Sequence, residues 1–354
     1  MKTANRNSRL VGIDALDSFD ALIDVRTPAE FADDHLPGAI NAPVLSNDER
    51  KLVGTIYKQE SAFKATRLGA ALVARNIATH LETVFADQPK NWKPLIYCWR
   101  GGKRSGSMVE WFNLIGWRAR QLDGGYKHWR NHVITELKQL PGQLHFVVLT
   151  GPTGSGKTHL LKSLAKVGAQ VLDLEGLARH RGSLLGAEPG LPQPSQRALE
   201  TQLYQRLASF DPARPVFVEA ESRRIGRLDL PSELMAALHQ GSCVRLEVTP
   251  DRRLAFLLQD YQHLFAAPDH FKQMLERLLG LHSRATIDAW QTWVDEDRRA
   301  ELFSSLMLEH YDPAYRRSSQ SNFVKLPEAF AFTYDPSQAD TRGEARQLLE
   351  QFES

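Results

Sequence analysis

Short apolar runs, many of them rich in β-branched residues, alternate along the chain with stretches of helical periodicity. Such runs are typical of buried strands, and the sequence has them at 21–25, 94–97, 144–150, 169–174, 216–218 and 244–249. Helical patterns follow several of these runs, at 105–114, at 159–166 and from Pro250. Because strands alternate with helices, we predict an α/β fold in which helices cover parallel sheets.

The pattern becomes helical after about residue 265. Apolar residues recur at helical spacing between 271 and 308, which predicts several helices around a core. At 310–318, aromatic residues beside two arginines could clamp RNA or pack against the preceding domain, and we favour packing. We therefore divide the chain into a first domain, 1–138, a second α/β domain, 139–265, and a helical C-terminal region, 266–354, packed on the second domain.

The composition is ordinary for a soluble globular protein. Of 354 residues, 42% are hydrophobic and 24% are charged. The net charge of +2 permits a nucleic-acid partner, but local clusters of cations would have to bind it. Two cysteines, Cys98 and Cys243, imply no disulfide framework. Aspartates interrupt the N-terminal segment, so we expect neither a signal peptide nor a membrane span, and a cytoplasmic location.

The strongest chemical signal is the sequence GPTGSGKT at 151–158, which matches the phosphate-binding pattern G-x-x-x-x-G-K-[ST] at every fixed position. It stands between a predicted strand and a predicted helix, as in a doubly wound P-loop domain. The helix N-terminus and the backbone N–H groups that glycines expose would face an anion. Lys157 would reach the terminal phosphates, and Thr158 would hold Mg²⁺. We assign phosphate binding to Gly151, Gly154, Ser155, Gly156, Lys157 and Thr158.

Further candidate residues follow other strands of this domain. A P-loop protein places a second metal-binding carboxylate at the end of an apolar strand, and Glu219 or Glu221 stands there where aspartate is usual. Basic residues nearby could neutralise the phosphates of a diphosphate or of RNA: Arg179, Arg181, Arg223, Arg224 and Arg227. For 179–181, a charged helix surface is an equally good explanation.

A cysteine of the first domain stands where its surroundings would activate it as a nucleophile. Cys98 follows the predicted strand 94–97 and precedes a Gly-rich loop and a helix. Backbone N–H groups, the helix dipole and the cations of Arg100, Lys103 and Arg104 would favour its thiolate. Cys243 lies inside a predicted core strand, so we expect it to be inert. The anion-binding loop would consist of Cys98, Trp99, Gly101, Gly102, Lys103, Arg104 and Ser105.

Four stretches of the first domain, 24–31, 35–41, 98–105 and 122–129, together resemble the rhodanese, or sulfurtransferase, domain. The resemblance implies that Cys98 carries a transferred sulfur as a persulfide. Arg104 follows Cys98 by six positions, a loop length that resembles the rhodanese-fold phosphatases. We hypothesise that this wider loop admits a selenophosphate-like donor or stabilises a perselenide. The polar stretch 45–65 fits no strand of a minimal rhodanese domain, and we expect a partly helical insertion that could touch a partner but is better explained as solvated surface.

Taken in order, the segments CWRGGKRS, GPTGSGKT, DLEGLARHRGS and ESRRIGR resemble the bacterial tRNA 2-selenouridine synthase family over almost the full chain. The resemblance implies a transferase that replaces the sulfur of wobble 2-thiouridine in tRNA by selenium from selenophosphate, which another enzyme supplies. It also implies geranyl diphosphate as a co-substrate and an S-geranylated tRNA intermediate. The P-loop would then hold a diphosphate leaving group, and Cys98 a selenium species. We predict Cys98, Arg100, Arg104 and Lys157 as catalytic residues.

Two other function classes fit the same two signatures. A small-molecule kinase fused to a rhodanese-like sulfurtransferase or phosphatase would phosphorylate a metabolite at the P-loop and cleave a phosphoester at Cys98. No acid in the Cys98 loop stands out as the general acid that this second reaction needs. A nucleotide-gated sulfur carrier would donate to a partner enzyme and would not bind RNA directly.

Overall fold

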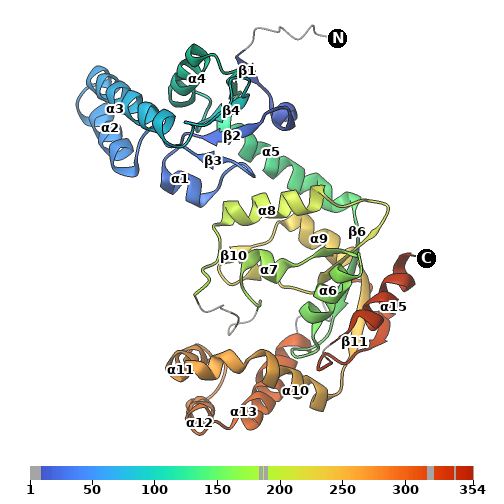
Figure 1. The fold of residues 1–354 in the computed structure, drawn as a ribbon. Coiled ribbons are helices and arrows are strands. Elements are labelled where there is room, and N and C mark those ends of the chain that lie inside the picture. Colours follow the sequence, from blue (N-terminus) through green and yellow to red (C-terminus); the bar gives the residue numbers. More distant parts are fainter. Residues whose placement is uncertain (1–8, 183–185, 187–189, 317–322, 339, 354) are drawn as a thin grey trace. The chain divides into compact units, whose positions relative to one another are not determined.

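The computed structural model describes residues 9–182, 186, 190–316, 323–338 and 340–353. The chain divides into two compact units, Met1–Thr135 and Glu136–Ser354, and each unit holds one five-stranded parallel sheet with helices on its faces (Figure 1). The division falls within helix α5 (Gly125–Gln139). This arrangement confirms the predicted α/β class. Among the described residues, no helix is both long enough and apolar enough to cross a membrane.

The sheet of the first unit has the strand order β1-β5-β4-β2-β3. Its strands are β1 (Leu10–Val11), β2 (Ala21–Asp24), β3 (Ile40–Asn41), β4 (Pro94–Tyr97) and β5 (Arg120–Leu122). The central pair is in register from Ala21 opposite Pro94 to Asp24 opposite Tyr97. The covering helices include α1 (Pro28–Asp33) and α4 (Lys103–Ile115). Because all strands are parallel, their carboxyl ends meet at one edge of the sheet, where β4 leads into the cysteine loop.

The polar stretch after residue 45 is more helical than the sequence predicted. It forms α2 (Asn47–Gln59), which a Ser46–Glu49 capping box begins, and α3 (Ala62–Glu82). The two helices form a hairpin, and a side chain at Gly69 of α3 would contact Val53 of α2 at 3.5 Å. We call this pair the α2–α3 hairpin.

The sheet of the second unit has the order β12-β11-β6-β8-β7. Its strands are β6 (His145–Thr150), β7 (Gln170–Leu172), β8 (Pro215–Glu219), β11 (Ser242–Glu247) and β12 (Phe330–Thr333). Its helices are α6 (Lys157–Lys166), α7 (Leu174–Ala178), α8 (Gln196–Ala208), α9 (Ser232–Gln240) and α15 (Arg342–Glu353). A separate two-stranded hairpin pairs β9 (Arg224–Ile225) with β10 (Leu228–Asp229). The buried centre of the sheet is β6, which ends at the P-loop.

A helical region follows β11, as the apolar periodicity predicted. It consists of α10 (Pro250–Asp260), the 3₁₀ turn Gln262–Ala266, α11 (Pro268–Glu276), α12 (Arg284–Asp295), α13 (Arg299–Ser305) and the π-helical segment Leu306–Tyr311. These elements enclose a core of their own around Phe271, Trp290 and Leu302.

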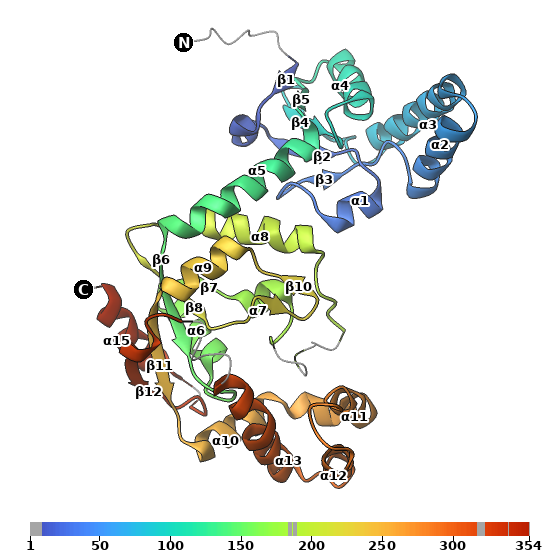
Figure 2. The same cartoon turned by 180° about the vertical axis from the view of Figure 1, so that it is seen from behind.

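The last described part of the chain returns to the sheet, which the sequence analysis did not predict. Strand β12 pairs with β11 along four residues, and α15 packs on α6 (Figure 2). The run FAFT at 330–333 is short, and Phe332 is its only buried residue. Its sequence pattern therefore gives little indication of a strand. It forms a strand because β11 offers an open edge.

Candidate active sites

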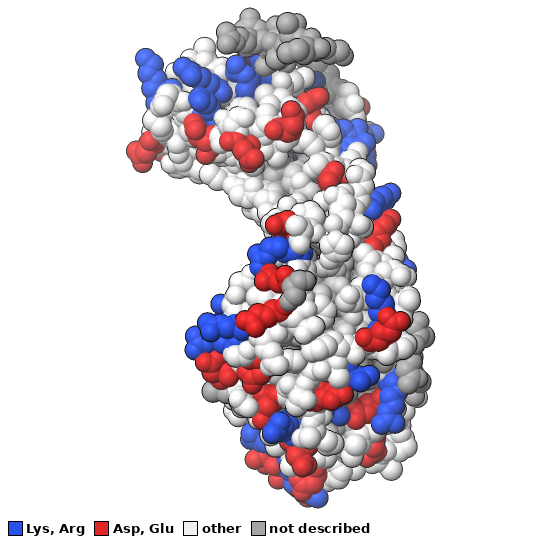
Figure 3. Space-filling model, turned by 90° about the vertical axis from the view of Figure 1, so that its right-hand side faces the viewer, with Lys and Arg blue, Asp and Glu red and all other residues white. Residues whose placement is uncertain are grey.

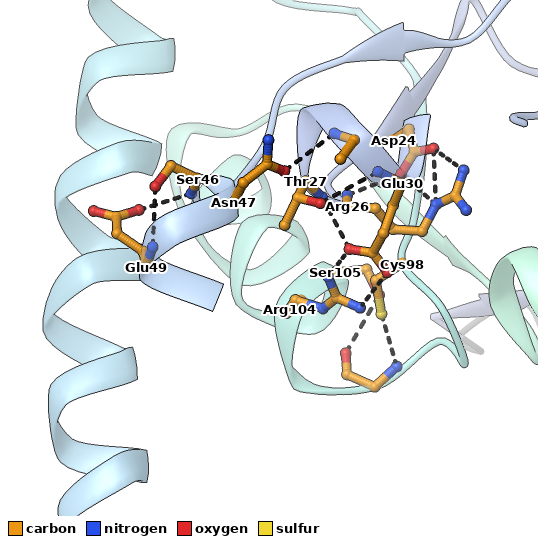
Figure 4. A network of polar contacts seen from close by, with 12 residues as sticks. Asp24, Arg26, Thr27, Glu30, Ser46, Asn47, Glu49, Cys98, Arg104 and Ser105 are labelled. Atoms are coloured by element: carbon orange, nitrogen blue, oxygen red, sulfur yellow. Dashed lines mark hydrogen bonds and ion pairs between the residues drawn. The ribbon is translucent and has the colours of Figure 1, made fainter. Parts of the chain in front are cut away.

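Cys98 lies directly after β4, buried at the base of the loop that leads into α4 (Figure 4). Its Sγ accepts a hydrogen bond from the backbone N–H of Gly102 at 3.2 Å and another from the Ser105 hydroxyl at 3.1 Å. Two donors are therefore aimed at the sulfur of the predicted nucleophile. The structure thus places Cys98, Gly102 and Ser105 together as predicted from the loop sequence.

The start of α5 fixes the shape of this loop from behind. The backbone N–H groups of Tyr126 and Lys127 donate to the carbonyls of Cys98 and Trp99, both at 2.9 Å. Gly125 has a φ of +59°, and a Cβ there would lie 2.3 Å from the Cys98 carbonyl oxygen. Only glycine fits such an approach, which explains the Gly-Gly pair at 124–125.

Gln121, in the middle of β5, contacts both residues that donate to the sulfur. Its side-chain amide donates to the Ser105 hydroxyl at 2.9 Å and to the Gly102 carbonyl at 3.1 Å. The Ser105 oxygen accepts a hydrogen bond from Gln121, so the Ser105 hydroxyl hydrogen is free to point to Cys98 Sγ or to the Gly102 carbonyl. Of these two acceptors, Cys98 Sγ is the nearer. Sequence reasoning missed Gln121 because it is remote from the loop in sequence and belongs to no motif.

Arg104 is paired with an acid that the sequence analysis did not assign to the site. Its guanidinium donates to the two carboxylate oxygens of Glu30 at 2.8 and 3.4 Å. Glu30 also accepts from the backbone N–H of Thr27 in the capping box of α1. Burial alone would raise the pKa of Glu30, but the guanidinium of Arg104 holds it below its usual value. Arg100 and Lys103 are exposed. The loop therefore has two cations at its surface, whereas the charge of Arg104 is neutralised by Glu30.

The P-loop of the second unit is curled tightly between β6 and α6. Gly151, Gly154 and Gly156 all have positive φ, at +155°, +85° and +71°. The Lys157 ammonium donates to the Gly151 carbonyl at 2.9 Å, so it lies across the loop that would surround a phosphate. Ser155 is buried, and its hydroxyl donates to the Pro152 carbonyl at 2.6 Å. The loop therefore has the shape that the motif predicted.

Three glutamates gather beside the P-loop. The Thr158 hydroxyl donates to Glu175 at 2.9 Å, and one oxygen of the fully buried Glu219 accepts the backbone N–H of Glu175 at 3.0 Å. The other Glu219 oxygen is buried without a hydrogen-bond partner. Burial, and then the charge of Glu175, raises the pKa of Glu219 well above its usual value and that of Glu221 to about 7. Such a cluster favours the uptake of protons or of a cation.

The predicted acids Glu219 and Glu221 are thus placed at the P-loop, and Glu175 is an addition. It begins α7, directly after β7, where neighbouring parallel strands bring their carboxyl ends together. The segment DLEGLARHRGS contained the signal, since its two acids follow a predicted strand.

A cavity of about 820 Å³ opens over the P-loop, and Glu175 and Glu221 line it, whereas the fully buried Glu219 does not. The P-loop and α7 form its polar wall, and the helical region forms a wall that includes Phe256, Tyr261, Tyr311 and Tyr315. The stretch 310–316 therefore faces this cavity through His310, Tyr311 and Tyr315, whereas 317 and 318 lie outside the described residues.

Of the five predicted arginines, the structure brings two to this cavity. Arg179 and Arg181 line it, and the Arg181 guanidinium pairs with Asp260 at 2.5 Å and stacks over the Tyr261 ring. The other three arginines are exposed on or beside the β9–β10 hairpin and do not line the cavity: Arg223, Arg224 and Arg227. Cys243 is buried in β11, and burial raises its pKa, as expected for an inert thiol.

Comparisons with known proteins match the two parts of the chain to two different family models. Residues 12–132 match the family model of the rhodanese-like domain, and residues 144–277 match the model described as tRNA 2-selenouridine synthase AAA domain. The chain is 36% identical to the tRNA 2-selenouridine synthase of Nitrosomonas europaea, over 92% of this chain and 91% of that protein. It is 36% identical to the protein of the same name from Bdellovibrio bacteriovorus, over 89% and 87% of the two chains. The corresponding Sulfurovum protein is 32% identical, over 86% of this chain and 90% of its own length.

Proposed function

The chain belongs to the tRNA 2-selenouridine synthase family, and on that premise we propose that it exchanges the sulfur of wobble 2-thiouridine in tRNA for selenium. The observation that carries the proposal is the similarity to proteins of this name over nine-tenths of the chain, which spans both sites. The geometry supports the proposal, because one chain holds a buried cysteine whose sulfur accepts two hydrogen bonds and a Gly-rich loop curled at a helix N-terminus. Selenophosphate as the selenium donor, supplied by another enzyme, and geranyl diphosphate as a co-substrate are parts of the same proposal.

The first step would take place at the P-loop. The thiocarbonyl sulfur attacks the geranyl carbon that bears the diphosphate, a carbon–sulfur bond forms, and the carbon–oxygen bond breaks with its electron pair leaving on the diphosphate. The ring N3 proton of the thiouridine is lost. Lys157 and the N–H groups of the loop would stabilise the charge that develops on the departing oxygen. The apolar side chains across the cavity would receive the geranyl chain.

The second step would use Cys98. The selenium of selenophosphate attacks C2 of the alkylated base, a carbon–selenium bond forms, and geranyl thiolate leaves with the electrons of the carbon–sulfur bond and takes up a proton. Water then cleaves the phosphorus–selenium bond and releases phosphate, which leaves 2-selenouridine. The donors on Gly102 and Ser105 that contact Cys98 Sγ would hold or orient the selenium species there. Arg100 and Lys103 would attract the anionic donor to the loop mouth.

The residues beside the P-loop fit a Mg²⁺ ion that the substrate completes. Among the described residues, no three His, Cys, Asp or Glu side chains form a metal cage of their own. Magnesium is instead commonly bound through one or two carboxylates, a hydroxyl and substrate phosphates. Thr158, Glu221 and the unpartnered oxygen of Glu219 would supply the protein oxygens. The ion would provide electrostatic stabilisation of the diphosphate.

Mass analysis of tRNA nucleosides tests the proposal. Thiolated tRNA is incubated with geranyl diphosphate and selenophosphate and each protein variant. We expect Lys157→Ala to abolish both the S-geranyl and the 2-selenouridine products, and Cys98→Ala to retain the S-geranyl product and lose 2-selenouridine. Loss of both products in both variants would contradict this division of labour. Unmodified tRNA in the presence of wild-type protein, with phosphorylation of a metabolite from ATP, would support the kinase alternative.

A further inference from the structure

We propose that the outward face of the α2–α3 hairpin binds RNA, contacting phosphates through its cations and unstacked bases through its aromatic side chains. This inference rests on the proposed function, because it locates part of the surface that a tRNA substrate would contact. The hairpin contributes none of the residues described around Cys98, so the proposal adds a contact surface to the site.

The cations of the hairpin gather in its central part. Between residues 50 and 75 the sequence has six lysines and arginines and one acid, Glu60, so this segment carries +5, whereas the acids at the two ends of the hairpin, Asp48, Glu49 and Glu82, bring the whole hairpin to +2. Over most of the face shown in Figure 3, cations are interspersed with acids, in keeping with the net charge of +2 of the whole chain. Net positive charge confined to one segment is the footprint of a polyanion-binding surface.

The helical spacing gathers these cations instead of scattering them. In α3, Lys64, Arg67 and Arg75 are separated by three and eight residues, which places them on one stripe of the helix. Exposed alanines at 70, 71 and 74 lie near these cations, and their small side chains leave the cations accessible. In α2, Lys51 and Lys58 are seven residues apart and share a face in the same way.

These cations are available to a partner. All six are exposed, and among the described ion pairs only Lys64 has an acidic partner, Glu60 at 3.7 Å. Both side chains of that pair are more than half exposed. A pair in such a position contributes little stability and exchanges readily for a phosphate.

Two large aromatic side chains stand beside the turn that joins the helices. Phe63 is 74% exposed and Tyr57 is 62% exposed, whereas the inward side of α3 is buried at Ala65, Gly69 and Ile77. Bases that leave the helical stack are bound by aromatic side chains interleaved with cations. A protein partner is the weaker explanation, because charged residues are depleted at the core of protein–protein interfaces, whereas cations follow this face along both helices.

Fluorescence anisotropy of labelled tRNA at several salt concentrations tests the proposal. We expect Lys64→Gln with Arg67→Gln to reduce the slope of log K against log salt by roughly 1.4 to 1.8, the value for two lost phosphate contacts. We expect Phe63→Ser to weaken binding roughly five-fold or more. All three side chains are exposed, so their replacement leaves the core of the unit intact.

Lys90→Gln with Arg118→Gln is the matched control, since both residues are exposed cations of the same unit outside the hairpin. It is expected to leave the salt slope within about 0.5 of the wild-type value. If the hairpin variants bind tRNA as wild type does while wild type modifies it, the inference fails and the proposed function stands. If wild type binds no tRNA at all, the proposed function fails, and the hairpin inference fails with it.

Discussion

The Thr158 hydroxyl of the P-loop helix donates a 2.9 Å hydrogen bond to the carboxylate of Glu175 at the start of α7. Two successive strand-to-helix connections therefore meet at the point where a P-loop protein binds Mg²⁺. Burial is the main cause that raises the pKa values of Glu219 and Glu221, and the charge on Glu175 raises both further. In the proposed Mg²⁺ site, Glu175 would orient the Thr158 hydroxyl and would add negative charge beside the metal.

We predict that Glu175→Gln weakens the Mg²⁺-dependent part of geranyl diphosphate binding by about ten-fold, because it removes one negative charge beside the proposed metal ligands. The amide oxygen can still accept the Thr158 hydrogen, so the change removes charge and spares the contact. Titration calorimetry with and without Mg²⁺ measures the effect, with Glu328→Gln, an exposed acid of the same unit, as the control. An unchanged response to Mg²⁺ would remove Glu175 from the metal site.

Stability should depend on pH through Glu221. Its pKa is about 7 in the folded protein, above the 4.5 of an exposed glutamate. The protonated side chain therefore stabilises the fold fully below pH 4.5, and this contribution is lost as pH rises through 7. We predict that the wild-type protein loses roughly 2 kcal/mol more unfolding free energy between pH 5 and pH 8 than the Glu221→Gln variant does. Urea unfolding without Mg²⁺ or phosphate measures it, and parallel pH curves for both proteins would contradict it.

Gln121 should control the reactivity of Cys98. In Gln121→Glu, the carboxylate can only accept the Ser105 hydrogen, so Cys98 Sγ loses a donor and gains a nearby negative charge. We predict that the pH midpoint of Cys98 alkylation by iodoacetamide rises and that the rate at pH 7 falls about five-fold or more.

Mass spectrometry of the alkylated peptide separates Cys98 from Cys243. Gln121→Leu removes the same hydrogen bond without adding charge and should have a smaller effect in the same direction. Ser107→Ala, on the exposed side of α4, is the control. A pH profile that neither Gln121 variant moves would limit Gln121 to a structural role.

A buried arginine of the helical region pairs with an acid of the same region and also contacts the P-loop. Arg253 of α10 donates to Asp312 at 3.0 and 2.5 Å and to the Thr153 carbonyl at 2.9 Å. We predict that Arg253→Met lowers the unfolding free energy by about 3–5 kcal/mol, because Asp312 keeps a buried, unpaired charge. The double variant with Asp312→Leu should recover much of the loss. Thermal or urea unfolding checks both, and a single variant as stable as wild type would contradict the argument.

Local patterns were sufficient to predict the elements whose signal lies within one segment. The strand at 94–97, the P-loop and the α10–α13 helices each combine periodicity with a motif or a clear boundary, and the structure contains all of them. The positions of Cys98 and Lys157 followed from those elements. The family resemblance rested on the same segments, and the comparisons confirmed it.

Residues whose role depends on distant contacts escaped prediction. Glu30 reaches Arg104 across 74 positions, and Gln121 reaches Ser105 across 16. No sequence periodicity predicts either contact, because each contact depends on the order of the parallel strands in the sheet. The same reason explains why Arg223, Arg224 and Arg227, which follow β8 in sequence, turn away on a hairpin of their own.

The return of the chain to the sheet as β12 has a consequence for synthesis. On the side of β11 away from β6, the edge of the sheet is covered only when β12, a strand from the last tenth of the chain, arrives. Tyr334 and Pro336, which follow that strand, lie so close to Gly156 that a Cβ there would clash with both. The first unit can fold while translation continues, whereas the P-loop cannot take its final packing until residues 330–336 have left the ribosome.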